Sequence, residues 1–430
     1  MNQSWTASCA TDLTGMRILR VIGSMAPSAG GPPQGIRNLL PALEEKGVEQ
    51  VIACLDPPGE PGLEDDCFMT RTLGPAKTSW AYSGSLRPWL RKHLRNFDAV
   101  ICHGLWQFPL MAVRWEVESL RRQGDAPRFF IYPHGMLDPW FQRDPSRRVK
   151  AWRNEIYWWL AERHNINSAD AVLFTCEEER RLAGSTFPGY QATEKVVGYG
   201  VPDPPASTPA MREAFLKACP GLHLQRPYML FLSRVHPKKG VDLLIRAYAK
   251  VVRGLVDPPD LVIAGPLHST YAKEMQALAT RLLAGTGKSG TKQAQPSAAG
   301  RIFFPGMLQG KAKWGALHGA KAFILPSHQE NFGIAVVEAL ACGTPVMISN
   351  RVNIWRSIAA AEAGVVEDDT MEGAERLVAS AIEMDPEEAE KMGRRGRGCF
   401  EREFSCVEAA RRLCRVLQTD SPKGDGPIVG

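Results

Sequence analysis

Short apolar segments alternate with amphipathic segments through the first half of the chain. The first apolar segment, residues 17–22, is followed by a glycine-rich turn at residues 28–31. The pattern then predicts a helix from Gly35 to Lys46 and a second strand over residues 51–55. Further apolar segments of this kind lie at residues 98–103, 129–134 and 169–175. Short buried strands that alternate with helical segments are typical of a parallel sheet covered by helices on both faces.

A second series of the same kind begins after a proline-rich stretch at residues 201–209. Its strands are predicted at residues 228–232, 261–264, 301–304, 322–325 and 345–348. Proline-rich sequence is stiff and poor in backbone hydrogen bonds, so the stretch is suited to join two domains. The expected fold class is therefore α/β, with two Rossmann-like doubly wound domains and a ligand-binding cleft between them.

These features set the expected domain boundaries. Residues 1–205 are predicted to form the N-terminal domain and residues 206–402 the C-terminal domain. The segment 403–418 has a helical pattern with one apolar face, so we expect this helix to pack back toward the N-terminal domain. Residues 284–300 are small and polar, which predicts a surface insertion, and residues 419–430 are expected to be a disordered tail.

The composition restricts the class of protein. Of 430 residues, 44% are hydrophobic and 23% are charged, which is ordinary for a globular protein and argues against disorder. No uncharged apolar stretch reaches the roughly 18–20 residues that cross a bilayer, and the first residues lack the pattern of a secretory signal. Ten cysteines without a Cys-x-x-Cys pair favour reduced thiols, so we expect a soluble cytoplasmic protein. The net charge of +6 is too small to indicate nucleic acid as a partner.

The most informative segment for chemistry runs from residue 325 to residue 345. A strand ends at its start and a helix is predicted to begin near Gly333, where free backbone N–H groups suit an anion such as a diphosphate. Glu330 lies just before this helix, and Glu338 lies inside its apolar run. A carboxylate there needs hydrogen-bond donors, and ribose hydroxyls are suitable ones. The alternative is that Glu330 only caps the helix and Glu338 is solvated.

A second basic segment also follows a predicted strand and precedes a helix. Arg234 and Lys239 are five residues apart across a turn, so both side chains could converge on one diphosphate. The alternative is an ordinary basic turn, and Lys238 is interpreted as a solvated neighbour.

Together, these segments resemble family 4 of the retaining glycosyltransferases, which have the GT-B architecture of two facing Rossmann-like domains. The match rests on Glu330-x7-Glu338 followed by Ala-Leu-Ala-Cys-Gly-Thr-Pro-Val, and on Arg234-x4-Lys239 followed by Gly-Val-Asp-Leu-Leu-Ile. It also includes the segments 264–266 and 304–307. In the first domain, the resemblance rests on the pair Gly30-Gly31 and on residues 134–140, His-Gly-Met-Leu-Asp-Pro-Trp.

The resemblance implies a role for each matching residue. Arg234 and Lys239 would neutralise the charge that develops on the leaving diphosphate. Glu330 would contact hydroxyls of the transferred sugar and help to stabilise an oxocarbenium-like centre, and His134 would lie near the sugar and the incoming acceptor. The implied donor-binding residues are Gly30, Gly31, Gly265, Gly306, Met307, Asn331, Phe332, Gly333 and Glu338, the last of which would hold the ribose.

The sequence predicts no metal. It also predicts no cofactor, because the nucleotide sugar is a substrate. The chain has no Asp-x-Asp, and its His and Cys residues do not show the spacing of a metal site. Residues 285–289 look like part of a phosphate loop, but Leu282 stands where the first glycine is required.

The expected function is a retaining hexosyltransferase. It would move a hexose from a nucleotide diphosphate sugar to a glycan or lipid-linked acceptor, in polysaccharide biosynthesis. A nucleotide-sugar isomerase or epimerase on the same two-domain scaffold is the alternative enzyme, and a non-catalytic binding protein is a third interpretation. A nicotinamide dehydrogenase is disfavoured, because Gly30-Gly31-Pro-Pro replaces the Gly-x-Gly-x-x-Gly fingerprint.

Two basic and aromatic segments bear on location. Residues 85–96 and 140–159 combine Arg and Lys with Trp, Tyr, Phe and Leu, a pattern that suits the surface of an anionic bilayer. The alternative is an amphipathic helix that covers its own sheet with Arg side chains outward. A bilayer contact would place the protein at the inner face of the membrane. His103, at the end of a predicted strand, is interpreted as a structural histidine.

Overall fold

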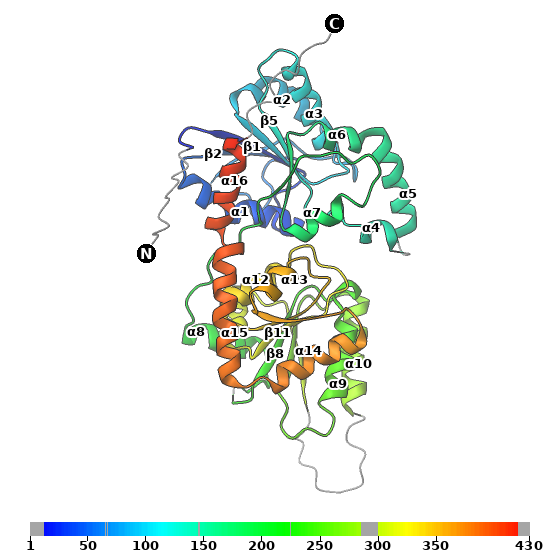
Figure 1. Cartoon of the computed structure of the whole chain (residues 1–430), viewed down its shortest axis with the longest axis vertical. Helices are drawn as coiled ribbons and strands as arrows, with labels where there is room; N and C mark the ends of the chain where they lie inside the picture. The colour runs from blue at the N-terminus through cyan, green and yellow to red at the C-terminus, as the bar shows by residue number, and fades with distance from the viewer. Residues whose placement is uncertain are drawn as a thin grey trace, which may run out of the picture. The chain divides into compact units, whose positions relative to one another are not determined.

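The computed structural model describes residues 13–64, 66, 68–144, 147–223, 225–284 and 300–419. Apart from Ala284, Gly300 and Thr419, the predicted insertion and the predicted tail lie outside this part of the chain. The chain divides into two compact units, the first formed by residues 1–200 and 406–430 and the second by residues 201–405 (Figure 1). The sequence analysis predicted these boundaries between residues 205 and 206 and between residues 402 and 403. The difference arises because the Val201 N–H donates to the Phe404 carbonyl at 2.9 Å, which joins both ends of the second unit.

All strands of the first unit belong to one parallel sheet with the order β3-β2-β1-β4-β5-β6-β7. The strands are β1 (Arg17–Ile22), β2 (Glu49–Cys54), β3 (Met69–Thr72), β4 (Ala99–His103), β5 (Arg128–Tyr132), β6 (Ala171–Phe174) and β7 (Glu194–Val196). The two edge strands, β3 and β7, were not predicted. Their sequences are polar and short, and neither strand is fully buried, so they lack the apolar pattern that marks the central strands.

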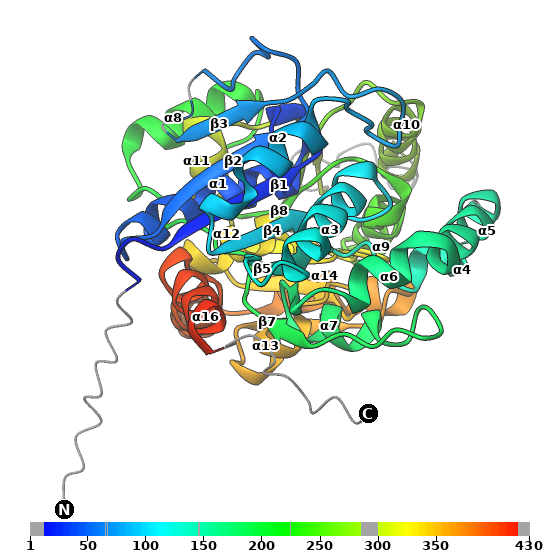
Figure 2. The ribbon, with the colours of Figure 1, turned by 90° about the horizontal axis from the view of Figure 1, so that it is seen from above.

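Helices cover both faces of this sheet. Its helices are α1 (Gly31–Glu44), α2 (Leu86–His93), α3 (Phe108–Arg121), α4 (Trp140–Arg143), α5 (Arg148–Tyr157), α6 (Arg163–Asn167), α7 (Glu177–Ala183) and α16 (Cys406–Thr419). One face packs against α2 and α3, and the other packs against α1 and α16. Figures 1 and 2 show α2 and α3 side by side, and α5 at the margin of the unit in both views.

Helix α1 begins four residues earlier than predicted. Gly30 is its N-cap residue with φ of 91°, and Pro32 and Pro33 lie in the first turn of the helix. Proline lacks a backbone N–H, but the first turn of a helix does not use that donor, so both prolines are tolerated there. The prolines therefore belong to the helix and not to the preceding loop.

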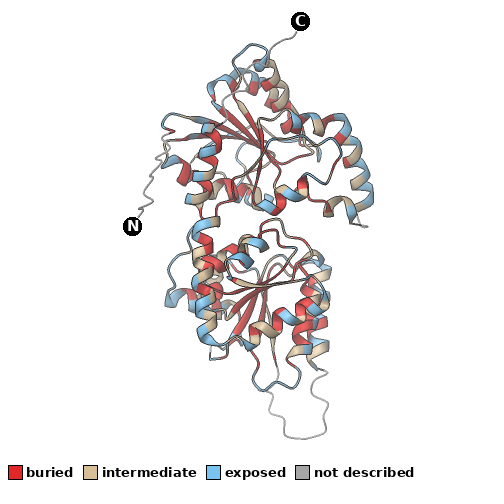
Figure 3. Ribbon diagram, in the orientation of Figure 1, coloured by how far each residue is buried: buried red, intermediate tan, exposed pale blue. Residues whose placement is uncertain are grey.

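The second unit repeats the same topology in a six-stranded parallel sheet with the order β10-β9-β8-β11-β12-β13. The strands are β8 (Tyr228–Leu232), β9 (Asp260–Ala264), β10 (Ile302–Gly306), β11 (Ala322–Leu325), β12 (Val346–Ser349) and β13 (Gly364–Glu367). Its helices are α8 (Pro209–Ala218), α9 (Val241–Val251), α10 (Thr270–Ala284), α11 (Gly310–Gly319), α12 (Ile334–Ala341), α13 (Trp355–Ala360), α14 (Met371–Glu383) and α15 (Pro386–Cys399). In Figure 3, the strands of both sheets are coloured mainly as buried.

The strand order fixes where chemistry is expected in each unit. The chain runs outward in one direction from β1 and in the other from β4, and it does the same from β8 and β11. Loops that leave the carboxyl ends of these adjacent strands diverge, and the crevice between them is the usual ligand site of such sheets. The eight described cysteines are free thiols inside or at the edge of the packed units.

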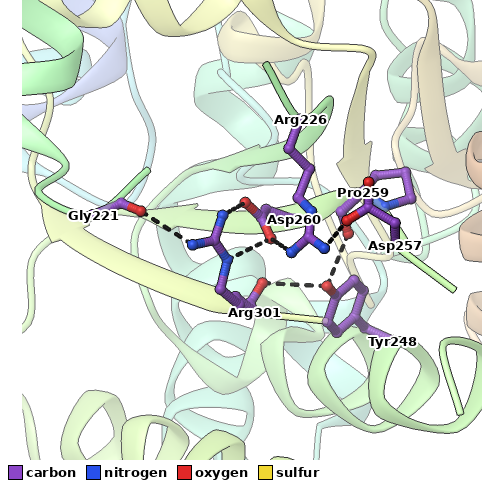
Figure 4. A network of polar contacts seen from close by, with 7 residues as sticks. All are labelled: Gly221, Arg226, Tyr248, Asp257, Pro259, Asp260 and Arg301. Atoms are coloured by element: carbon purple, nitrogen blue, oxygen red, sulfur yellow. Dashed lines mark hydrogen bonds and ion pairs between the residues drawn. The ribbon is translucent and has the colours of Figure 1, made fainter. Parts of the chain in front are cut away.

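The opposite, amino-terminal edge of the second sheet is held by a buried ion-pair network (Figure 4). The Asp260 carboxylate is fully buried and receives Arg301 Nη2 at 2.6 Å and Nε at 3.1 Å, with Arg226 Nη1 at 3.4 Å. The Tyr248 hydroxyl donates to the carbonyls of Pro259 and Arg301 at 2.8 and 3.2 Å. These contacts join β9 and β10 to α9 away from the carboxyl ends of the strands.

We expect Asp260→Asn to destabilise the second unit, because Arg226 and Arg301, whose side chains are 10 and 35% exposed, lose the fully buried carboxylate that both contact. The expected loss in the free energy of unfolding is about 3–5 kcal/mol. Glu375→Gln is the matched control, since Glu375 pairs with the exposed Lys250, and it should cost less than about 1 kcal/mol. Chemical denaturation of both variants measures the difference, and equal losses would contradict the role assigned to Asp260.

Candidate functional site

An ion pair joins the carboxyl ends of β8 and β11 in the second unit. Lys239 follows β8 and is 3% exposed, and its Nζ contacts the Glu330 carboxylate, which follows β11. Glu330 does not cap α12, whose N-cap position is Gly333 and has no side-chain cap. The structure thus brings together two predicted site residues that are far apart in the chain, at the point where the strand order reverses.

Close backbone packing holds the two strand-end loops together. Gly240 has φ of 65°, and a Cβ atom built there would lie 2.0 Å from the Pro326 carbonyl oxygen. The Lys238 carbonyl accepts hydrogen bonds from the His328 N–H and the Ser327 hydroxyl, each at 2.9 Å. Only glycine fits both the left-handed conformation and the close approach at position 240. Gly240 therefore fixes the backbone next to Lys239, from which the lysine side chain extends.

The surrounding cations keep Glu330 ionised. Burial raises the pKa of Glu330, but the charges of Lys239, Lys238 and Arg234 outweigh burial and hold that pKa below its usual value. Burial and the same three cations lower the pKa of His236 in this turn, so it stays neutral. Arg234 itself is exposed. The turn after β8 is therefore strongly positive and faces one carboxylate.

The neighbouring strand ends add the predicted glycines. The Ser233 N–H donates to the Ala264 carbonyl at 3.1 Å, and a Cβ on Gly265 would lie 2.0 Å from the Ser233 carbonyl oxygen. The Gly265 N–H in turn donates to the Gly306 carbonyl at 2.9 Å. Met307, the next residue, is 63% exposed. These contacts place the loops after β9 and β10 beside the loop that carries Arg234.

Helix α12 begins after Gly333, as predicted. Gly333 has φ of 78° and ends the loop that starts at Glu330. The Glu330 N–H donates to the Arg351 carbonyl, and the Glu330 carbonyl accepts from the Asn353 N–H, both at 2.9 Å. Phe332 is buried against the edge of Phe404, with ring centroids 5.8 Å apart. The loop that contains Asn331 is therefore fixed at its backbone and at one buried side chain.

Glu338 has a partner that the sequence analysis did not identify. Its Oε1 accepts a hydrogen bond from Lys313 Nζ of α11 at 2.8 Å, and Lys313 also lies over the Trp314 ring at 4.1 Å. The Glu338 side chain is 12% exposed, so it is not a solvated helix residue. The carboxylate in an apolar helix correctly indicated a need for donors, but nothing in the sequence links it to residue 313.

In the first unit, Tyr199 joins the glycine pair to the strand ends. The Tyr199 hydroxyl donates to the Gly31 carbonyl, and its ring lies where a Cβ on Gly35 would clash at 2.6 Å. Gly30 has open space around it. Tyr199 and His134 line the same small cavity, so the start of α1 and the end of β5 lie close together.

His134 is held in an unusual backbone conformation at the end of β5. Its φ is 51°, and its ring stacks on Tyr132 with centroids 4.3 Å apart. The next N–H, that of Gly135, donates to the buried carboxylate of Glu179 at 2.5 Å. Burial lowers the pKa of His134 to about 3, helped by the charge of Arg20. His103 Nδ1 lies 2.9 Å from His134 Nε2, so His103 contacts a predicted site residue.

The predicted site residues fall into two groups. Ten of them lie in the second unit: Glu338 lies within α12, and the other nine lie at or after the carboxyl ends of adjacent strands, namely Arg234, Lys239, Gly265, Gly306, Met307, Glu330, Asn331, Phe332 and Gly333. Gly30, Gly31 and His134 lie in the first unit. The sequence analysis missed Arg20 and Glu179. A charged residue at the centre of an otherwise apolar strand was the available signal for Arg20, whereas Glu179 gave none among neighbouring acidic residues.

The two basic and aromatic segments have different environments. In the segment 85–96, which contains α2, Leu86, Leu90 and Leu94 are buried in the core, and Arg87 and Arg91 pair with Glu116. That segment covers its own sheet. By contrast, α5 and the following π-helical turn, residues 158–162, expose the large apolar residues Val149, Trp152, Ile156, Trp159 and Leu160.

No metal-binding group and no membrane-spanning helix is found among the described residues. Within that part of the chain, no group of three or more His, Cys, Asp or Glu side chains could hold a metal ion. None of the described helices is long and apolar enough to span a bilayer.

Two family models match the chain, one in each unit. Residues 30–200 match the model described as Glycosyl transferase 4-like domain, and residues 215–398 match the model described as Glycosyl transferases group 1. Together they include every site residue discussed above except Arg20.

Two curated relatives illustrate the sequence similarity. A D-inositol 3-phosphate glycosyltransferase of Xylanimonas cellulosilytica is 27% identical over 244 residues, which cover 55% of this chain and 51% of that protein. A GDP-mannose-dependent alpha-(1-6)-phosphatidylinositol monomannoside mannosyltransferase of Mycolicibacterium smegmatis is 28% identical over 286 residues, or 62% of this chain and 68% of that protein. The chain thus spans about half the length of the first relative. Both names are those of transferases, which does not favour the isomerase or epimerase alternative.

Solved structures share the fold. Sucrose-phosphate synthase from Thermosynechococcus elongatus matches with a TM-score of 0.67 and 18% identity, over 93% of this chain and 98% of that chain. Anabaena HepE in complex with UDP and glucose matches with a TM-score of 0.68 and 16% identity, over 94% of this chain and 100% of that chain. At such low identities, the likeness establishes the two-domain α/β fold alone.

The Lys239–Glu330 pair predicts an acid-dependent loss of stability. Because the folded-state pKa of Glu330 lies below its unfolded value of about 4.3, the pair stabilises the protein above that pH. This stability is lost as the pH falls through the folded-state pKa. At pH 7, Glu330→Gln should lower the free energy of unfolding by about 1–3 kcal/mol. The difference from wild type should shrink steadily below about pH 4.5.

Chemical denaturation between pH 3.5 and 7 measures this dependence. Glu213→Gln is the control, because Glu213 is an exposed residue of α8 in the same unit. A difference between wild type and Glu330→Gln that stays constant across this pH range would contradict the pairing.

Proposed function

The chain belongs to family 4 of the GT-B glycosyltransferases, and from this premise we propose that it is a retaining hexosyltransferase. The donor is a nucleotide diphosphate sugar, and the acceptor is a glycan or a lipid-linked sugar of polysaccharide biosynthesis. The observation that carries the proposal is the contact between Lys239 and Glu330 at the strand-order reversal, beside the exposed Arg234.

The charges around this contact suit a leaving diphosphate. Lys239 has three N–H donors and uses one of them on Glu330, which leaves donors for phosphate oxygens. Arg234 would bind the same group with its planar fork. Both cations would act most strongly on the charge that develops as the bond from the sugar carbon to the phosphate oxygen breaks. In this proposal, these cations carry the neutralising charge and the protein needs no metal.

The remaining residues of the second unit would bind the donor. Backbone N–H groups of Asn331, Phe332 and Gly333 would face the phosphates or the sugar, and Glu338 would accept hydrogen bonds from the ribose. Met307, with Gly265 and Gly306 behind it, would lie against the base. The backbone constraints described above favour a preorganised site, because the loops have little freedom left to lose on binding.

Retention requires the acceptor oxygen to approach from the face that the diphosphate leaves. The bond from the sugar carbon to the phosphate oxygen breaks, the bond to the acceptor oxygen forms, and the acceptor proton passes to a diphosphate oxygen. Glu330 would stabilise the positive sugar centre through its hydroxyl contacts. Gly30 and Gly31 would let the backbone at the start of α1 approach the phosphate, and His134 would contact the sugar or the acceptor.

A direct assay separates this function from its alternatives. A panel of nucleotide sugars is first screened for thermal stabilisation of the protein, which identifies the donor. Nucleotide release is then measured with and without candidate acceptors. A transferase releases nucleotide in proportion to added acceptor, whereas an isomerase converts the donor without any acceptor and a binding protein does neither.

The proposal predicts that Arg234→Ala lowers turnover far more than it weakens donor binding. Loss of one preorganised charge at the leaving group should reduce kcat by about 10²–10³-fold. Arg253→Ala is the control, because Arg253 is an exposed cation just beyond the carboxyl end of α9. Steady-state kinetics and donor titration measure the two effects. An equal loss in both would instead assign Arg234 to ground-state binding.

We also propose that the α5 surface, residues 148–160, contacts an anionic membrane at the inner leaflet. The side chains of Val149, Trp152 and Leu160 are 82, 70 and 75% exposed. The same surface exposes Arg148, Lys150 and Arg153. Exposed large apolar residues beside cations match the two components of an anionic bilayer surface, its acyl boundary and its headgroups. A lipid-linked acceptor would be presented at such a surface.

The membrane proposal predicts that Trp152→Ser combined with Leu160→Ser weakens binding to vesicles of phosphatidylcholine and phosphatidylglycerol. Loss of two apolar side chains that would insert into the bilayer should reduce partitioning at least about tenfold. Val256→Ser is the control, since Val256 is a 90% exposed apolar residue of the second unit. Vesicle co-sedimentation measures the effect. Unchanged partitioning, or an equal loss in the control, would contradict the proposal.

A further inference from the structure

A buried arginine occupies the centre of β1. Arg20 is 1% exposed, and its Nε donates to Gln50 Oε1 at 2.9 Å. Its Nη1 lies 3.2 Å from His103 Nε2. Its Nη2 is buried without a hydrogen-bond partner among the residues described, and no carboxylate in that part of the chain pairs with it. The core of the first unit therefore contains a cation that contacts one amide in β2 and one histidine in β4.

This arrangement is costly for a purely structural role. Burial lowers the pKa of Arg20 only to about 10, so the guanidinium remains charged at neutral pH. An apolar side chain of similar size would fill the same space without the cost of an unpaired charge. The groups that the Arg20 donors contact should therefore explain why a charged residue occupies this position.

The contacts of Arg20 continue as a chain of hydrogen bonds to His134. Arg20 Nη1 contacts His103 Nε2, and His103 Nδ1 lies 2.9 Å from His134 Nε2. The two imidazole rings are 18° from parallel, with centroids 5.2 Å apart. The chain of hydrogen bonds thus leads from the centre of β1, through the end of β4, to His134, two residues after the end of β5.

The chemistry of the first member fixes the direction of every bond in this chain. A guanidinium has only donors, so His103 Nε2 must accept and carries no proton. Neutral His103 therefore holds its proton on Nδ1 and donates it to His134 Nε2. Neutral His134 must then hold its own proton on Nδ1. A protonated His134 would direct an N–H against the N–H of His103, so the chain also opposes the imidazolium form.

We propose that Arg20 is a positioning residue that acts through His103 and holds His134 as the neutral tautomer with its proton on Nδ1. His134 Nδ1 has no hydrogen-bond partner among the described residues and is left to donate to a substrate oxygen. The nitrogen presented in this way has no lone pair, so His134 donates a hydrogen bond and does not accept the acceptor proton.

A ligand-binding role for Arg20 itself does not fit the space around it. The cavity lined by Arg20, His103, His134 and Tyr199 holds about 10 Å³. That volume is no larger than about one water-sized probe, far below the roughly 300 Å³ or more of a small-molecule site.

The other groups around His134 leave the chain undisturbed. The Glu179 carboxylate is occupied by the Gly135 N–H and by Thr175. The Tyr132 hydroxyl donates to the Gly198 carbonyl. Within the described residues, His103 thus makes the one hydrogen bond that reaches the His134 ring, and Arg20 sets its direction.

The part of this inference that concerns turnover rests on the proposed function, whereas the tautomer does not. The tautomer is measured first, in the full chain labelled with ¹⁵N-histidine, by two-bond ¹H–¹⁵N correlation. The chain has nine histidines, and the spectrum of His134→Gln identifies the His134 signals. We expect wild-type His134 to carry its proton on Nδ1 from pH 6 to pH 8. A proton on Nε2, or titration of His134 in this range, would overturn the proposal whether or not the protein transfers a sugar.

Two substitutions then test the role of Arg20. Arg20→Met removes the donor with little change in volume, and His134 should lose its single Nδ1-protonated state. In the transferase assay, kcat should fall about 10- to 100-fold while the donor KM stays unchanged. Arg20→Lys retains a cationic donor and should restore part of both the tautomer and the turnover.

Structural damage is distinguishable from the proposed effect. If Arg20→Met does not fold, the wild-type tautomer and the Arg20→Lys variant still decide the question. A folded Arg20→Met protein with wild-type kcat would overturn the positioning role. So would a kcat loss in Arg20→Met with an unchanged His134 tautomer.

Discussion

The ion pair between Lys239 and Glu330 is the contact on which the arrangement of the second unit's strand ends depends. It joins two loops that leave adjacent parallel strands in opposite directions, at the point where the strand order reverses. Removal of either partner is unfavourable, because it leaves the other, largely buried charge without its ion-pair partner. The glycine after Lys239 permits the contact, since any Cβ there would meet the Pro326 carbonyl. The close backbone packing at Gly240 and the ion pair between Lys239 and Glu330 thus depend on each other. The exposed Arg234 lies in the same loop as Lys239.

The two units share a topology but handle a buried cation in opposite ways. In the second unit, Lys239 contacts the Glu330 carboxylate and helps to hold the pKa of that carboxylate below its usual value. In the first unit, Arg20 meets neutral histidines, and burial together with its charge keeps them neutral. A cation next to a carboxylate fixes two charges, whereas a cation next to a histidine fixes the direction of a hydrogen bond. The same strand order therefore supports an electrostatic site in one unit and a hydrogen-bonding site in the other.

The sequence predicted what depends on local pattern and missed what depends on distant partners. The central strands and the start of α12 were identified, because apolar runs and glycines mark them directly. The edge strands β3 and β7 lacked that pattern, and α1 extended through two prolines that its first turn accommodates. Lys239 was predicted near the diphosphate and Glu330 near the transferred sugar, but the ion pair between them was not predicted. Lys313, Glu179 and Arg20 act through partners 25 to 83 residues away, and one sequence does not identify a partner at such a distance.

His134 stays neutral, whereas Glu330 beside Lys239 stays ionised. This difference bears on how a retaining transfer would avoid a side reaction with water. A basic histidine next to the sugar would also activate water, and water would then compete with the acceptor. A His134 held as a neutral donor lacks that ability at its exposed nitrogen. In the proposed reaction, the acceptor proton would pass to the diphosphate oxygen, whose basicity would rise only as its bond to the sugar breaks. Under this arrangement, the base becomes available only during the transfer, so proton removal and departure of the leaving group are coupled by charge.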